Sequence, residues 1–267
     1  FAAFFTALYI IGEFRIGNTI AKSVNEDFIN LEVIFAGLIA AIIWNLLTWW
    51  FGIPSSSSHT LIGGFMGAAL MHAFYTQYQL VSGAHADAGI MNNIIQAFKN
   101  LLTLDVVKYE KVIPIFLFIF LAPIVGMIVS VIITLIIVFI SRKSVPHKAD
   151  RVFKKLQLLS SALFSLGHGT NDAQKVMGII GAAIIYHHVQ TLHDPIYLAL
   201  ESKERFSYFV THYVWVPFAS FLAIALGTMS GGWKIVKTMG TKITKVTPLE
   251  GVSAETAGAI TYFLQEN

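Results

Sequence analysis

Two short polar segments interrupt long apolar stretches of this chain, and their residue types could bind small ions. The first, residues 54–60, reads PSSSSHT, and the second, residues 167–175, reads GHGTNDAQK. One offers hydroxyls and an imidazole, whereas the other offers an amide, a carboxylate and an amine. Hydroxyl and amine groups donate to oxyanions, and carboxylate and amide oxygens are ligands for hard cations. Each segment is therefore a candidate ion site.

The serine segment has the features of an anion site at the start of a helix. A helix that begins near Ser56 leaves its first backbone N–H groups without partners and exposes the positive end of its dipole. Such an end binds oxyanions. The hydroxyls that add donors there belong to Ser56, Ser57, Ser58 and Thr60. His59 is either a structural histidine or a direct ligand, and a plain polar turn is the alternative for the whole segment.

Asp172 needs an explanation, because a charge near the centre of a bilayer costs about 2.5 to 3.5 kcal/mol. A salt bridge to Lys175, one helical turn away, would be a structural explanation. A functional one is a site for a coupling cation, with the Asp172 carboxylate and the Asn171 amide as oxygen ligands. Backbone carbonyls freed around Gly167 and Gly169 would add to that site. Lys175 would then supply positive charge to an anion or exchange a proton with it.

A third polar cluster contains His187, His188, His193 and Asp194. Metal ligands on one helix face are three or four residues apart, and the separations here are one, five and six. The cluster is therefore interpreted as a loop at the membrane interface. A hydrolase site built from Ser58, His59 and Asp172 is a weaker alternative, because the pattern around Ser58 is not that of a nucleophile elbow.

The composition indicates an integral membrane protein. Charged residues make up 12% of the 267 residues, whereas a soluble domain has about 25%. No Asp, Glu, Lys or Arg occurs in 33–86, 112–141 or 206–233, and each of these stretches exceeds the roughly 20 residues of a spanning helix. The chain is therefore predicted to cross the membrane more than once. It contains no cysteine, which excludes disulfides and thiolate metal sites.

A basic loop divides the chain. Residues 142–155 hold six Lys or Arg residues against one Asp. Because the loop joins two apolar segments, the positive-inside rule places it in the cytoplasm, and nucleic-acid binding is not expected. We predict a first transmembrane repeat over 1–140, a cytoplasmic linker over 141–155 and a second repeat over 156–267. We further expect the start of the first and the end of the second to lie outside this sequence.

Several transmembrane elements follow from the apolar pattern. We expect crossings over 112–140 and 206–228, interfacial segments over 76–111 and 233–245, and the end of a helix over 1–12. Residues 33–51 are either one crossing or, if Gly37 breaks the helix, residues 38–51 are a re-entrant segment with the serines at its tip. Residues 156–166 advance about 16 Å, half of the apolar core, so a break at Gly167 and Gly169 would place Asn171 and Asp172 near the midplane.

A weak internal similarity links the two halves. Residues 35–42, FAGLIAAI, and 256–263, TAGAITYF, share an Ala-Gly pair at matching places. If the similarity marks a repeat, the second serine element falls beyond Asn267.

Long sequence motifs resemble a known family. Residues 40–64, AAIIWNLLTWWFGIPSSSSHTLIGG, and 167–180, GHGTNDAQKVMGII, resemble the two signature regions of the inorganic phosphate transporter family in its bacterial form. LAPIVG at 121–126 and GTMSGGWKIVKTMGTKI at 227–243 are also similar to it, so the resemblance covers nearly the whole chain. It implies an all-α, polytopic transmembrane helical bundle with inverted repeats and broken or re-entrant helices. It also implies a first Asn-Asp element before Phe1 and a second serine element after Asn267.

The resemblance also implies roles for the polar residues. The expected phosphate ligands are Ser56, Ser57, Ser58, Thr60, Thr170, Asn171 and Lys175. Asn171 and Asp172 are expected to bind the coupling cation, with His59, Gly167, Gly169 and Gln174 in support. Many sodium-coupled members continue Asn-Asp with x-Ala-Asn, whereas Ala173, Gln174 and Lys175 follow here. This departure favours protons over sodium.

We therefore expect a secondary active transporter that imports inorganic phosphate in symport with H+ or Na+ by alternating access. No enzymatic activity, cofactor, catalytic residue or resident metal is expected. Phosphate could travel as a metal-phosphate complex, and the other partners are the lipid bilayer and, as an open option, a second copy of the chain. The expected location is the bacterial inner membrane. A sulfate permease on the same scaffold, an intramembrane hydrolase and a channel are the alternatives.

Overall fold

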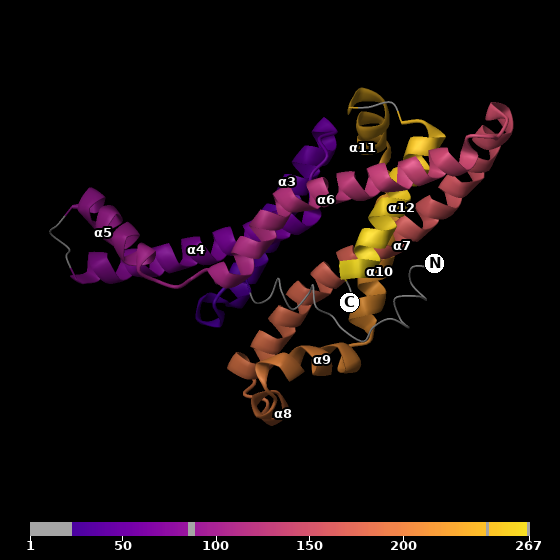
Figure 1. Ribbon diagram of the computed structural model, residues 1–267. Helices are drawn as coiled ribbons and strands as arrows, with labels where there is room; N and C mark the ends of the chain where they lie inside the picture. The colour runs from indigo at the N-terminus through magenta and orange to yellow at the C-terminus, as the bar shows by residue number, and fades with distance from the viewer. Residues whose placement is uncertain (1–22, 85–88, 244–245, 266–267) are drawn as a thin grey trace. The chain divides into compact units, whose positions relative to one another are not determined.

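The computed structural model describes residues 23–84, 89–243 and 246–265, and in this part of the chain the regular elements are helices (Figure 1). An isolated bridge joins Val24 to Val107. The predicted helix end over 1–12 lies outside the described residues. The helices of at least ten residues are α3 (Leu31–Phe51), α4 (Ser57–Ala84), α5 (Ile90–Leu102), α6 (Tyr109–Ser141), α7 (Pro146–Tyr186), α9 (Ser202–His212), α10 (Trp215–Gly231) and α12 (Pro248–Gln265).

Shorter helical segments connect these elements. The 3-10 turn η1 (Glu26–Phe28) precedes α3, and the π-helical turn η3 (His187–Thr191) with α8 (Pro195–Ala199) joins α7 to α9. After α10 come α11 (Trp233–Lys237) and a second π-helical turn, η4 (Thr238–Ile243). The all-α fold class predicted from the sequence is confirmed.

The chain forms two compact units, and neither is continuous in sequence. The first, here called the α6 unit, contains the described residues of 114–173 and 218–267. The second, the α3–α4 unit, contains those of 14–113 and 174–217. Both units draw on residues before and after the basic linker. The linker itself becomes helical at Pro146, where α7 begins. The division at residues 141–155 stays a prediction.

Capping residues determine where α3 begins and ends. The Asn30 side chain accepts a hydrogen bond from the Val33 N–H at 2.7 Å, which satisfies a donor of the first turn. Gly52 ends the helix at φ 68°, a left-handed conformation that glycine adopts without steric cost, and its N–H bonds to the Thr48 and Trp49 carbonyls. Pro54 follows and cannot continue the helix.

Gly37 does not break α3, so of the two alternatives that the sequence left open, the re-entrant segment is excluded and one continuous helix is found. The helix runs from Leu31 to Phe51 as one apolar segment of 21 residues, long enough to span a membrane. Gly37 instead permits close packing, because a Cβ there would lie 3.0 Å from the Phe65 Cα on α4. A Cβ at Gly64 would lie 2.6 Å from the Gly37 carbonyl oxygen. The two backbones are therefore nearly in contact.

The core of the α3–α4 unit is built around these two helices. Buried apolar side chains from the residues flanking η1, from α3 and α4, from the segment between α5 and α6 and from the second half of α7 pack together: Val24, Ile29, Val33, Ile34, Phe65, Ala69, Ala73, Val106 and Ile179. α5 packs against α4 through its buried residues Asn93 and Ala97.

α6 is the longest apolar helix of the other unit, and it contains the residues 112–140 that were predicted to cross the membrane. It has 33 residues, and none of those described is buried by the rest of the chain. Pro114 and Pro123 lie within it, and the helix continues through both. A helix that is apolar on all sides and exposed along its length is typical of a membrane span.

The second predicted crossing, over 206–228, is not a straight helix. α9 ends at His212 and α10 begins at Trp215, so the helix is interrupted between these residues. Within the described residues, two helices are long and apolar enough to cross a membrane, or three if this bent pair counts as one broken span. The interfacial placement of 76–111 and 233–245 stays a prediction, although both stretches are largely helical.

The contact between α3 and α4 predicts the effect of a single methyl group. We expect Gly64→Ala to destabilise the fold by about 1–3 kcal/mol, because the new Cβ would overlap the Gly37 carbonyl and force the helices apart. Gly67→Ala is the matched control on the same helix, since nothing lies within 4 Å of its added Cβ. Alanine there should be neutral or stabilising. Thermal unfolding in detergent measures both, and equal melting temperatures would contradict the close approach.

Candidate functional site

The serine segment forms the turn between α3 and α4 and the first turn of α4. The chain leaves α3 at Gly52, passes Pro54 and enters α4 at Ser57. Ser56 occupies the N-cap position, because its carbonyl accepts the Thr60 N–H at 3.0 Å and its Oγ accepts the His59 N–H at 3.4 Å. The expectation that a helix begins near Ser56 is confirmed.

Hydrogen bonds within this turn already use some of its polar groups. The His59 Nδ1 lies 2.7 Å from the Ser56 Oγ, so the imidazole orients that hydroxyl. The Thr60 hydroxyl donates to the Ser56 carbonyl at 2.8 Å, which leaves its oxygen as an acceptor. His59 is exposed and bonded to Ser56, so it is not a buried structural histidine, and its role in supporting the site stays a prediction.

A groove of about 390 Å³ runs along this turn. It is lined by Ala40, Trp44, Ser55, Ser56, His59, Thr60, Gly63 and Gly64. Gly63 and Gly64 leave part of its α4 wall without side chains, and Trp44 contributes an aromatic side chain from α3. Of the four hydroxyl residues predicted as phosphate ligands, Ser56 and Thr60 line the groove. Ser57 and Ser58 are half-buried and are not part of its lining.

The second polar motif lies within an unbroken helix, which corrects the sequence prediction. α7 continues from Pro146 to Tyr186, so Gly167 and Gly169 do not interrupt it. Each glycine costs a helix only about 1 kcal/mol, and the apolar residues on both sides outweigh this cost. The backbone carbonyls around the two glycines therefore remain in the helical hydrogen-bond pattern, and the predicted carbonyl ligands are not released.

The polar side chains of the α7 motif that belong to the α6 unit occupy adjacent positions on the helix. Asp172 pairs with His168 on the preceding turn, with 3.3 Å between its Oδ2 and the His168 Nε2. The Asn171 side chain is buried, and its Oδ1 has no hydrogen-bond partner among the described residues. The Thr170 hydroxyl donates to the Leu166 carbonyl at 2.9 Å, so its oxygen can only accept. These side chains present oxygen acceptors, which suit a cation.

The predicted site residues are divided between the two compact units. The serine turn, Gln174 and Lys175 belong to the α3–α4 unit, and the residues from Gly167 to Asp172 belong to the α6 unit. Gln174 and Lys175 are half-buried.

Sequence reasoning missed a second carboxylate in the α6 unit, that of Glu255 on α12. Its two oxygens accept hydrogen bonds from the Ser160 and Ser161 hydroxyls on α7, each at 2.7 Å. Gly258 brings α12 close to α7, since a Cβ there would lie 2.5 Å from the Phe164 ring. The sequence features that could have identified this contact are the single acidic residue in the small-residue stretch SAETAGA and the Ser-Ser pair in LLSSALF.

The paired hydroxyls predict a stability effect. Ser160→Ala should destabilise the fold by about 1.5–3 kcal/mol, because it removes one of two hydrogen bonds to a partly buried carboxylate. Thr134→Ala is a control, since the Thr134 hydroxyl bonds only to the carbonyl four residues before it in α6. The melting temperature in detergent is the measurement. If Ser160→Ala and Thr134→Ala shift it equally, the serine pair does not stabilise Glu255.

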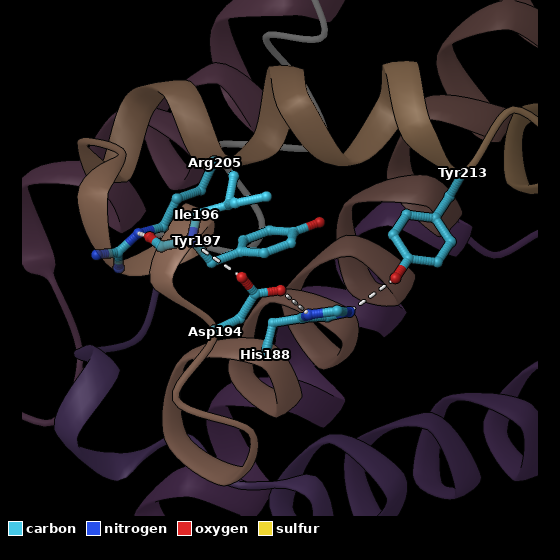
Figure 2. Close-up of polar contacts among 6 residues, drawn as sticks. All are labelled: His188, Asp194, Ile196, Tyr197, Arg205 and Tyr213. Carbon is cyan, nitrogen blue, oxygen red and sulfur yellow. Dashed lines mark hydrogen bonds and ion pairs between the residues drawn. The ribbon is translucent and has the colours of Figure 1, made fainter.

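The histidine cluster around η3 is more ordered than a surface loop (Figure 2). His188 lies between Asp194 and Tyr213, and the Tyr197 ring stacks on its imidazole at a centroid distance of 4.5 Å. The hydrogen bond with His188, aided by the Ile196 N–H, lowers the pKa of Asp194 from its ordinary value. Burial raises the pKa of Tyr197 to about 12, and nearby Tyr213 and Tyr208 add to that effect.

The raised pKa of Tyr197 predicts a stability change at alkaline pH. An unfolded tyrosine ionises near pH 10, so below that pH both states are neutral and the stability is unaffected. Between about pH 10 and about 12 the unfolded state loses this proton first, so stability falls as pH rises. Denaturation over this range, with Tyr197→Phe as comparison, is the test. Tyrosinate absorbance that shows no tyrosine ionising near 12 would contradict it.

The apolar helices, the polar groove and the oxygen acceptors define an all-α integral membrane protein of the transporter class. The whole chain, residues 1–267, matches the family model described as phosphate transporter family. The chain belongs to this family, as its motifs predicted. The family is one of transporters, which removes the hydrolase alternative.

Three curated relatives are each named probable low-affinity inorganic phosphate transporter. The one from Rhizobium meliloti is 35% identical over 98% of this chain, the one from Bacillus subtilis 36% over 91%, and the one from Mycobacterium leprae 36% over 98%. The chain spans 66%, 62% and 54% of the lengths of these relatives, respectively. No solved structure matches the chain.

Proposed function

We propose that the intact protein imports inorganic phosphate in symport with a cation by alternating access, with protons favoured over sodium. Family membership and the names of the relatives support phosphate as the substrate. The observation that carries the proposal within this chain is the groove at the first turn of α4. A helix of 28 residues presents its positive end there, next to serine hydroxyls.

The groove supports phosphate binding through hydroxyl and backbone donors. Ser55 and Ser56 supply hydroxyls, and the free N–H groups of the first turn of α4 point toward the same end of the helix. Gly63 and Gly64 let a ligand approach the backbone. Thr60 would have to release the Ser56 carbonyl before it could donate to phosphate. Ser57, Ser58, Thr170, Asn171 and Lys175 complete the proposed phosphate ligands.

The cation is assigned to Asn171 and Asp172. The buried Asn171 oxygen without a partner supports this assignment, because a cation or a proton donor would satisfy it. The pairing of Asp172 with His168 supports protons, since a carboxylate and an imidazole can share and exchange one. The sequence Ala173-Gln174-Lys175 supports the same choice. Glu255 is a second carboxylate of the same unit that coupling could use.

Other features of the transporter follow from the same proposal. We assign the protein to the bacterial inner membrane as a multi-pass protein without a cofactor, with phosphate carried free or as a neutral metal-phosphate. An inverted repeat is supported by Gly37 and Gly258, since the two glycines of the matching Ala-Gly pairs both lie at tight helix contacts. A homo-oligomer is compatible with this arrangement.

Phosphate uptake into vesicles containing the intact protein tests the proposal. We expect uptake that is driven by an inward proton gradient and that continues without sodium. Asp172→Asn should reduce accumulation at least about tenfold, because an amide cannot exchange the coupled proton. The control is Asp150→Asn, since Asp150 pairs with Lys154 in the exposed first turns of α7. Strict sodium dependence would overturn proton coupling, and normal accumulation by Asp172→Asn would make that residue structural.

Competition distinguishes phosphate from sulfate. Both are tetrahedral oxyanions, and excess sulfate should leave labelled phosphate uptake unchanged if phosphate is the substrate. Inhibition by sulfate at equal concentration would favour a sulfate permease.

A further inference from the structure

The connection between α6 and α7 carries a dense basic surface that the proposed ion site does not use. α6 ends at Ser141 and α7 begins at Pro146, so only residues 142–145 lie between the two helices. All of these residues belong to the α6 unit. Six exposed basic side chains lie in this connection and in the first three turns of α7: Arg142, Lys143, Lys148, Arg151, Lys154 and Lys155.

A single acidic residue accompanies these six basic residues. The Asp150 carboxylate pairs with the Lys154 ammonium at 2.8 Å, one turn away on the same helix. The Arg151 Nη2 lies 3.3 Å from the His147 Nε2, which positions the guanidinium without cancelling its charge. Residues 142–155 therefore keep a large positive charge on an exposed surface.

Apolar helix surface borders the basic surface on both sides along the chain. α6 is long and apolar enough to span a membrane, and its last residues Phe139 and Ile140 are exposed. On α7, the exposed Leu158 follows the basic residues. The Arg142 guanidinium lies 4.2 Å from the centroid of the Phe139 ring, which holds this charge at the end of α6. The basic surface therefore lies where the apolar core of a bilayer meets its headgroups.

The first turns of α7 have a basic face and a buried face on opposite sides. Lys148, Arg151 and Lys155 are spaced by three and four residues, so they share one side of the helix, here called the basic face. Phe153 and Ser160 are buried and seven residues apart, so they share the other side. The basic face therefore points away from the packed interior of the α6 unit.

An apolar face adjoins the basic face of α7. It consists of Val152, Leu156 and Leu159, which are exposed and spaced by four and three residues. At 3.6 residues per turn, the mean directions of the apolar and basic faces differ by about 75°. One molecule with an anionic head and an apolar tail could therefore contact both faces.

We propose that the basic face and the apolar face of α7 together bind an anionic phospholipid. The headgroup phosphate lies on Lys148, Arg151 and Lys155, and an acyl chain lies along Val152 and Leu156. Guanidinium and ammonium groups form charge-assisted hydrogen bonds with phosphate oxygens, and basic clusters next to a membrane span attract anionic lipids. Inorganic phosphate would use the basic face alone, so the exposed apolar face beside it favours a lipid.

A fluorophore beside the site measures lipid binding there. This sequence has no cysteine, so a cysteine introduced at the exposed Leu158 can carry the label in an intact protein freed of any other cysteine. The protein is reconstituted in vesicles of phosphatidylcholine and phosphatidylglycerol, one of which is brominated so that it quenches fluorescence on contact. We expect brominated phosphatidylglycerol to quench more strongly than brominated phosphatidylcholine. The same label at Ile132, in the interior of α6, should show no preference.

Charge variants with the Leu158 label test the basic face. Lys155→Gln should lower the ratio of the association constants of phosphatidylglycerol and phosphatidylcholine about threefold to fivefold, the effect of one basic residue near an anionic surface. The matched control combines Asp150→Asn with Lys154→Gln, which removes a charge pair from the same turns without changing the net charge. It should change the ratio by less than about 1.5-fold. An unchanged ratio in Lys155→Gln, or an equal loss in both proteins, would overturn the site.

The same measurement identifies any other occupant of these faces. If neither brominated lipid quenches the label at Leu158, protein covers the surface and the lipid site is wrong. Sodium phosphate and sodium chloride of equal ionic strength should lower the ratio equally, because both act by screening. Stronger competition by phosphate would assign the basic face to the free ion and contradict a lipid site. Quenching needs no transport, so its result does not depend on the function proposed above.

Discussion

The approach of α3 to α4 at Gly37 and Gly64 is the contact on which the serine groove depends. The groove takes one wall from Ala40 and Trp44 on α3 and the other from the first turns of α4. Two glycines let these walls come together with backbone against backbone. In a bilayer, where water does not drive helices together, such close packing is a main source of helix association. The position of the serine hydroxyls therefore follows from two residues that have no side chain.

The apolar surroundings also explain why the polar groups of this membrane protein are paired. Unsatisfied donors and charges are costly in an apolar medium. Glu255 is held by two hydroxyls, Asp172 by a histidine, and Thr170 bonds back to its own helix. Each partner lies in the same unit. It is either one turn away on the same helix, or on a neighbouring helix that a glycine brings close. Asn171 is the exception among the motif residues, and an exception of this kind is expected at a functional site.

Much of the fold could be predicted from the sequence, because apolar length and the absence of charge identify a membrane helix directly. The crossing at α6 and the helix start at Ser56 follow from such local signals. Glycine was the source of the error in α7: Gly167 and Gly169 were predicted to break the helix, and a break at Gly37 was one of two alternatives for α3, yet all three glycines lie within continuous helices. The break between α9 and α10 has a local signal in Pro217, in the first turn of α10, whereas the contact between Tyr213 and His188 joins residues that are distant in sequence. Glu255 was missed for the same reason, since its serines lie 94 and 95 residues away.

The buried Asn171 oxygen also has a thermodynamic consequence for a carrier. An acceptor without a partner raises the free energy of the unloaded protein by about 1–3 kcal/mol. If the coupling ion binds at Asn171 as proposed, it lowers the free energy of the loaded protein, so loading and folding stability would be linked through one atom. The same atom would then limit how tight binding can be, because a carrier must return through its unloaded state to complete each cycle. A modest destabilisation of the empty form would favour binding of the ion without preventing its release.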